Sequence, residues 1–180
     1  MNKQEKLAKL MDDKDHLKKI EAEFKAGKAQ AIDFEITLVE EPENYVRERY
    51  TGRGHRFYNA KQGIMKDMKA KMKEMVPAFH RKRLEKLFKS EKAVYYVHIF
   101  ADFFVKIPKA DSVDTTILKE KKVMLPDQTP DLDNYIKLLV DVLHEVAYDD
   151  DKRVVHFTSS KYYSVRPRTE LKVRIDIIKE

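Results

Sequence analysis

The stretch YYVHIFADFFVKI, residues 95–107, decides the fold because every second residue in it is apolar. The apolar row is Tyr95, Val97, Ile99, Ala101, Phe103, Val105 and Ile107. A period of two places such a row on one face of an extended strand. Pro108 follows at once and ends the strand. The pattern therefore predicts a long strand with one face in the hydrophobic core.

The segments around this strand predict the rest of the domain. Residues 32–38 alternate in the same way, and two further strands are expected over 153–163 and 170–178. The other expected segments are an amphipathic helix over 2–26 ended by Gly27, a basic loop over 40–61, a helical region over 61–90 that Pro77 interrupts, a loop over 109–130 and a helix over 132–147. These elements predict one α/β (α+β) domain over 31–180, with about four strands in a mixed sheet, flanking helices and an N-terminal helical extension over 1–30.

Composition excludes several classes of protein. The chain of 180 residues has no Cys, which removes disulfides, thiolate metal sites and Cys nucleophiles. Its four Gly are not spaced for a phosphate-binding loop, so no nucleotide cofactor is expected. No apolar run reaches the roughly 18 residues of a membrane span, and the N-terminus lacks the apolar centre of a signal peptide. We expect a soluble, cytoplasmic protein without a membrane partner.

Opposite charges are concentrated in two windows of the chain. Residues 44–90 hold fourteen Lys and Arg against four Asp and Glu, and residues 127–151 hold eight Asp and Glu against one Lys. The basic window favours a polyanion such as nucleic acid, but carboxylates repel phosphate. A bound divalent cation reverses that repulsion, and hard oxygen ligands suit Mg²⁺ or Mn²⁺. The combination predicts a metal-dependent reaction on a phosphodiester.

Each window also has a purely structural interpretation. Asp131 or Asp133 is well placed to be only a helix N-cap, and the run 149–151 is equally typical of a solvated turn. The basic loop is also compatible with a flexible solvated segment. Its candidate DNA-binding residues, which would grip phosphates or stack on bases, are Arg47, Arg49, Arg53, Arg56, Tyr58 and Lys61.

The spacing around Lys137 places a cation near the acidic residues. Asp133, Lys137 and Asp141 recur every four residues and share one face of the predicted helix. From there Lys137 can stabilise charge on a scissile phosphate. An ordinary surface ion pair with either aspartate explains the spacing equally well.

The segment TPDLDNYIKLLVDVLHEVAYDDDKRVV, residues 129–155, resembles the signature of the RusA family of Holliday junction resolvases, which is common in phages and prophages. That signature reads P-D-L-D-N-x-x-K-x-x-x-D-x-L, followed by D-D-x-x-V-V. The resemblance extends over about 31–178. Two departures are Thr129, where the family often has a basic residue, and the absence of a G-R-P-R run in the early loop.

The resemblance implies roles for specific residues. The catalytic carboxylates fall on Asp131, Asp133 and Asp151, the catalytic lysine falls on Lys137, and Asp150 is a further candidate metal ligand because three consecutive aspartates leave the alignment ambiguous. The family also implies a homodimer with two separate active sites, acting on branched DNA.

We therefore expect a Mg²⁺-dependent (or Mn²⁺-dependent) endonuclease that resolves four-way DNA junctions by paired phosphodiester hydrolysis in recombination and repair. The alternative is a non-catalytic, nucleic-acid-binding phage regulator whose acidic patch binds a protein partner.

Overall fold

The computed structural model describes residues 30–43, 49–51, 56–58 and 62–179, together with scattered positions between 11 and 22. The extension expected over 1–30 and its helix over 2–26 lie almost entirely outside the described residues. No helix in the described part of the chain is long and apolar enough to cross a membrane.

A four-stranded mixed sheet forms the centre of the domain, as predicted. Its strands are β1 (Gln30–Leu38), β4 (Val94–Lys106), β5 (Val154–Ser164) and β6 (Arg168–Lys179). The order across the sheet is β1-β6-β4-β5. β6 pairs antiparallel with both β1 and β4, whereas β4 and β5 run parallel. The stretch that decides the fold is thus an inner strand, which explains its continuous apolar row.

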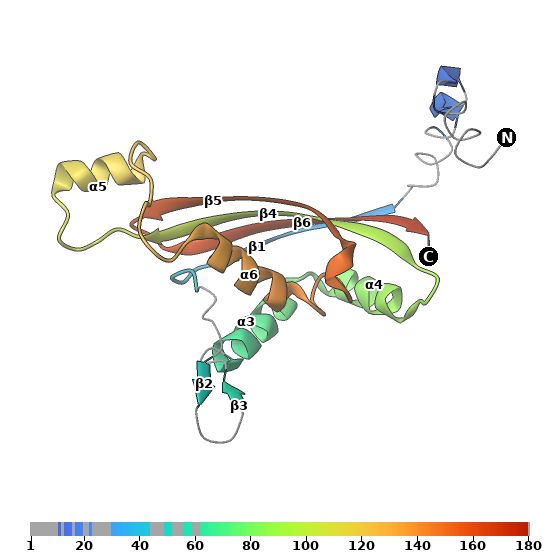
Figure 1. Cartoon of the computed structure of the whole chain (residues 1–180), viewed down its shortest axis with the longest axis horizontal. Helices are drawn as coiled ribbons and strands as arrows, with labels where there is room; N and C mark the ends of the chain where they lie inside the picture. The colour runs from blue at the N-terminus through green and yellow to red at the C-terminus, as the bar shows by residue number, and fades with distance from the viewer. Residues whose placement is uncertain are drawn as a thin grey trace.

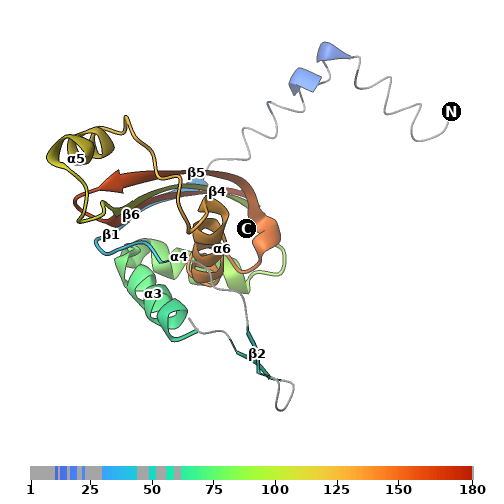
Figure 2. The ribbon, with the colours of Figure 1, turned by 60° about the vertical axis from the view of Figure 1, so that its left-hand side comes forward.

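Three helices cover one face of this sheet (Figure 1 and Figure 2). They are α3 (Gln62–Met75), α4 (Ala78–Lys89) and α6 (Leu132–Leu143). Pro77 separates α3 from α4, as expected of a residue that cannot continue a helix. A fourth helix, α5 (Val113–Glu120), lies beyond the end of the sheet.

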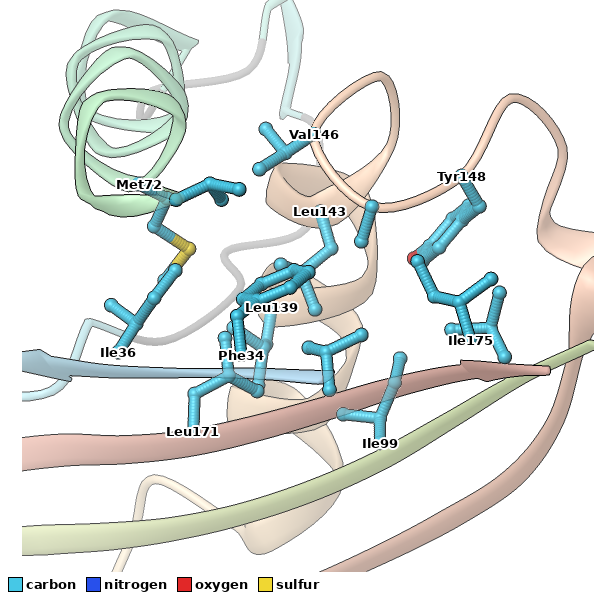
Figure 3. Close-up of a cluster of buried hydrophobic side chains, with 14 of the residues drawn as sticks. Phe34, Ile36, Met72, Ile99, Leu139, Leu143, Val146, Tyr148, Leu171 and Ile175 are labelled. Atoms are coloured by element: carbon cyan, nitrogen blue, oxygen red, sulfur yellow. The ribbon is translucent and has the colours of Figure 1, made fainter. Parts of the chain in front are cut away.

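The core lies between the sheet and these helices. Phe34, Val173 and Ile99 are paired in register across three strands, and all point to the helical face. Leu139 of α6 and Met72 of α3 pack against this row (Figure 3). Burying each such side chain contributes about 1.5–3 kcal/mol, so the apolar row fixes which face of the sheet α6 covers.

Two segments predicted as loops contain secondary structure. The segment 109–130 includes α5. Its N-cap residue is Ser112, whose hydroxyl accepts a hydrogen bond from the Thr115 N–H at 3.2 Å. The segment 40–61 includes a small antiparallel hairpin of β2 (Arg49–Thr51) and β3 (Arg56–Tyr58).

The helix predicted over 132–147 ends earlier, at Leu143. Glu145 adopts a positive φ of 66°, and its N–H donates to the Tyr148 carbonyl at 2.7 Å, closing a turn. Val146, Ala147 and Tyr148 remain buried in that turn. The apolar pattern therefore continued past the end of the helix, which made the prediction four residues too long.

Candidate active site

The first pair of predicted catalytic carboxylates lies at the N-terminal end of α6. Asp131 occupies the N-cap position, but its side chain makes no capping hydrogen bond. Asp133 lies in the first turn, where the helix dipole favours a negative charge. Lys161 of β5 donates to the carbonyl oxygens of Gln128 and Pro130 at 2.9 and 3.0 Å. The chain entering α6 is thereby fixed to the sheet, while the Asp131 carboxylate is not used for capping.

Lys137 lies one helical turn after Asp133 and pairs with it. The Lys137 ammonium donates to Asp133 Oδ2 at 2.8 Å. This hydrogen bond and the positive charge hold the pKa of Asp133 below its ordinary value. The structure thus places Lys137 beside Asp133, an arrangement that fits both the catalytic interpretation and an ordinary surface ion pair.

The second group of carboxylates lies at the other end of α6, where the chain enters β5. Asp149 accepts a hydrogen bond from the buried Tyr95 hydroxyl, and its N–H donates to the same hydroxyl at 3.2 Å. Burial, followed by the hydrogen bond to Asp149, raises the pKa of Tyr95. The Arg153 guanidinium lies over the Tyr95 ring, 4.6 Å from its centroid. Asp149 thus has a structural role that fixes the turn carrying the next two aspartates.

Asp150 and Asp151 differ in what their side chains do. Asp150 caps the short 3-10 helix η1 (Asp151–Arg153) by accepting from the Lys152 N–H at 3.0 Å, and it pairs with the Lys152 ammonium at 2.7 Å. The Asp151 carboxylate makes no hydrogen bond or ion pair with the residues that the structure describes. Of the two candidates, Asp151 is the carboxylate available to bind a ligand.

Asp141 is a neighbour of Asp151. The sequence analysis placed it only on the helix face that it shares with Asp133 and Lys137. Partial burial raises the pKa of Asp141, and the negative charge of Asp151 raises it further. Both carboxylates therefore belong to the end of α6 that faces η1.

Within one chain the two groups do not meet. α6 rises about 1.5 Å per residue, so Asp133 and Asp141 are separated by about 12 Å along the helix axis. Among the described residues, no group of three or more His, Asp or Glu side chains is arranged to hold a metal ion. The sequence showed the acidic residues as one window of 25 positions, whereas the fold divides them between the two ends of one helix.

The candidate DNA-binding residues are only partly described. Arg47, Arg53 and Lys61 lie outside the described residues. Arg49, Arg56 and Tyr58 belong to the β2–β3 hairpin, in which Arg49 is paired with Tyr58 in register. Both views place this hairpin beyond α3, away from the sheet (Figure 1 and Figure 2).

Two lysines of α3 are engaged in ion pairs with the domain itself. Lys71 contacts Glu40 at 2.8 Å, and Lys69 contacts Glu145 at 3.1 Å, beside the end of α6. The basic window of the sequence is therefore partly neutralised within the fold.

The fold alone defines an α/β protein with one mixed sheet, helices on one face and carboxylates at both ends of α6. Comparison with known families defines the activity class. Residues 41–174 match the family model described as "Endodeoxyribonuclease RusA". That match covers more than half of the chain, which therefore belongs to the RusA endodeoxyribonuclease family.

A curated relative is an uncharacterized protein of Bacillus subtilis (strain 168), YqaN. It is 44% identical to this chain over 55 residues, which are 31% of this chain and 39% of that protein. The match thus spans about two fifths of the relative's length.

Proposed function

We propose that this chain is a Mg²⁺-dependent, structure-selective endonuclease that resolves four-way (Holliday) DNA junctions by paired phosphodiester hydrolysis in recombination and repair. The observation that carries the proposal is that the carboxylates of Asp131 and Asp151 have no structural role in the described part of the chain. Both lie within the matched region 41–174, and neither carboxylate serves as a cap or ion-pair partner in the described structure. Carboxylates without a structural role are free to bind a ligand. Residues 31–180 form the nuclease domain in this proposal, and 1–30 an appended segment.

The side chains present suit a hard divalent cation. Asp131, Asp133 and Asp151 offer only carboxylate oxygens, the ligands that Mg²⁺ and Mn²⁺ prefer. When bound, such a cation supplies a water of lowered pKa and neutralises charge on the phosphate. Asp150 is a weaker candidate ligand because its carboxylate is occupied by η1 and Lys152.

The working unit in this proposal is a twofold homodimer. One chain holds Asp131 and Asp133 at one end of α6 and Asp151 at the other. A second chain that runs in the opposite direction places its Asp151 beside Asp131 and Asp133 of the first chain. The twofold axis repeats this contact, so the dimer has two complete sites. Symmetric dimers are the commonest closed oligomers. Two such sites also match the two equivalent phosphates that a four-way junction presents on opposed strands.

The remaining residues have supporting roles. Lys137, held beside Asp133, stabilises negative charge developing on the scissile phosphate. The basic hairpin and its flanks contact the DNA backbone through Arg47, Arg49, Arg53, Arg56 and Lys61, and Tyr58 stacks on exposed bases.

The test is cleavage of a labelled synthetic four-way junction by the purified full chain, beside a linear duplex of the same sequence. We expect cleavage of the junction with Mg²⁺ and none with a chelator or with Asp133→Asn. Tight junction binding without cleavage under any divalent cation would contradict the proposal and support the non-catalytic DNA-binding alternative.

A further inference from the structure

The segment that leads into α6 is held by little packing. Residues 121–131 contain no helix or strand, and the side chains of Gln128 and Thr129 are exposed. A hollow of 150 Å³ lies beside this segment, and Pro130, Tyr135 and Tyr163 are among the residues that line it. Burial therefore does little to fix the backbone immediately before Asp131.

The sequence of this segment also limits its hydrogen bonding. Pro126 and Pro130 have no N–H, so the backbone at these positions can only accept hydrogen bonds. The Lys161 ammonium is the donor, at 2.9 Å from the Gln128 carbonyl and 3.0 Å from the Pro130 carbonyl. Within the described part of the chain, residues 126–130 make no other hydrogen bond. The conformation of the backbone before Asp131 thus depends on one side chain.

The register of the sheet explains how Lys161 reaches this segment. Lys161 of β5 is paired with Phe103 of β4, so both side chains lie on the helical face of the sheet. The Phe103 ring in turn stacks on the Tyr135 ring of α6, with the two centroids 5.1 Å apart. A regular strand therefore holds the Lys161 ammonium next to the beginning of α6.

The contacts of Lys161 favour a role within the protein. A lysine beside catalytic carboxylates would ordinarily be assigned to a DNA phosphate. An ammonium has three N–H groups, however, and Lys161 donates two of them to backbone carbonyls. These two bonds fix the residues on either side of Thr129, directly before the helix that carries Asp131 at its N-cap.

We propose that Lys161 is a positioning residue of the active site, which fixes the Gln128 and Pro130 carbonyls and so holds the Asp131 carboxylate in position to bind a divalent cation. The inference rests on the proposed function, in which Asp131 is a metal ligand. Lys161→Met removes the donor but keeps a long side chain, whereas Lys161→Arg keeps both the charge and the donors. The matched control is Lys172→Met, because Lys172 lies on the opposite face of the same sheet, where it pairs with Glu35 at 3.3 Å.

Backbone order parameters from NMR test the fixation without metal or DNA. In the wild-type full chain, the amides of Gln128, Thr129 and Asp131 should have order parameters of about 0.85, the value of rigid backbone. In Lys161→Met they should fall to about 0.6 or below, and in Lys172→Met they should stay at the wild-type value. Values below about 0.6 in the wild-type chain would overturn the inference even if no variant at Lys161 folds.

Binding of Mn²⁺, measured by calorimetry in the absence of DNA, tests the connection to the metal site. Removing a residue that orients a metal ligand typically weakens metal binding about 10–100-fold. We expect a rise of that size in the dissociation constant of Lys161→Met, and values close to wild type in Lys161→Arg and Lys172→Met. Unchanged Mn²⁺ affinity in a folded Lys161→Met protein would overturn the inference, as would an equal loss in Lys161→Arg.

The salt dependence of junction binding separates this role from a phosphate contact. Loss of one phosphate contact makes the slope of log K against log salt shallower by about 0.9. The slope of Lys161→Met should equal that of the wild type, and a change of about 0.9 would assign Lys161 to DNA and overturn the inference. A wild-type chain that binds no Mn²⁺ and cuts no junction would refute the proposed function. The order parameters would still show whether Lys161 fixes the segment before Asp131.

Discussion

Lys137 and Asp133 form an ion pair one turn apart on α6, with Nζ 2.8 Å from Oδ2. Both side chains are more than half exposed, at 54% and 59%. Exposed pairs at this spacing contribute only about 0.3–0.5 kcal/mol to stability. The pair therefore matters little for folding, and its proposed value lies in positioning a cation beside a catalytic carboxylate.

Replacing Lys137 separates its contribution to catalysis from its contribution to stability. In Lys137→Met we expect junction cleavage to fall by about 100-fold or more, because a preorganised positive charge is lost. The melting temperature should change little. The pKa of Asp133 should rise toward its ordinary value, since the ammonium that lowers it is gone. NMR titration of the carboxyl group measures that rise, and unchanged cleavage in a folded Lys137→Met protein would reduce Lys137 to a surface ion pair.

The individual aspartates should differ according to what their side chains do in the fold. Asp131→Asn, Asp133→Asn and Asp151→Asn each remove a charge at nearly constant volume, so cleavage should fall by at least about 100-fold while junction binding persists or tightens. Asp150→Asn is the matched comparison, because Asn also caps helices and this carboxylate is already engaged by Lys152. Gel-shift and cleavage assays on the same preparations measure both effects. A larger loss in Asp150→Asn than in Asp151→Asn would reverse our assignment.

Mixing two inactive variants tests whether the carboxylates come from two chains. A heterodimer of Asp133→Asn and Asp151→Asn has one site with both changes and one site with neither, if each site is shared. After equilibration of equal amounts, roughly a quarter of all sites should be intact, because about half of the dimers are heterodimers. Sites built within single chains would give no recovery. The nicking rate of the mixture therefore distinguishes the two arrangements.

Asp141 should affect stability in a pH-dependent way. Its pKa is raised in the folded protein, first by burial and then by the charge of Asp151. The folded state thus disfavours the ionised form, and this group costs stability above its folded pKa. Asp141→Asn should raise the melting temperature at about pH 7, and the gain should shrink as the pH is lowered into the acidic range, because the wild-type carboxyl then takes up its proton. An equal gain at both pH values would show that the effect is not electrostatic.

The basic hairpin should control the salt dependence of junction binding. An Arg53→Ala/Arg56→Ala double variant loses up to two phosphate contacts, so the slope of log K against log salt should become shallower by up to about 1.8. Lys71→Ala is the control, since that ammonium is paired with Glu40. Equal slopes for wild type and double variant, measured by fluorescence anisotropy, would remove the hairpin from the DNA contact surface.

The sequence was most informative where one strong pattern dominates an element. The structure confirms the strands predicted from the alternation of β4 and β6 and the break predicted at Pro77. These patterns were readable because they directly reflect burial and backbone chemistry. α5 escaped prediction because its apolar residues face outward and its eight residues are too few for a sustained pattern. The hairpin of β2 and β3 has only three residues per strand, too short to show alternation.

The acidic residues show a different limit of sequence reasoning. Their types and order were readable, but a window of sequence does not show that Asp131 and Asp151 lie at opposite ends of α6. Nor does it show that Asp149 and Asp150 are engaged by Tyr95 and Lys152. That information depends on tertiary packing, in particular on the turn at Glu145 that carries the chain from α6 into β5.

The most direct test of the proposed function is the product formed from a supercoiled plasmid with an extruded cruciform. A dimer with two metal-dependent sites should cut opposed strands within one binding event, so the wild-type chain with Mg²⁺ should release linear plasmid, and a chelator should abolish this product. Plasmid that stays intact, or that accumulates only as nicked circles, would contradict paired resolution by this chain.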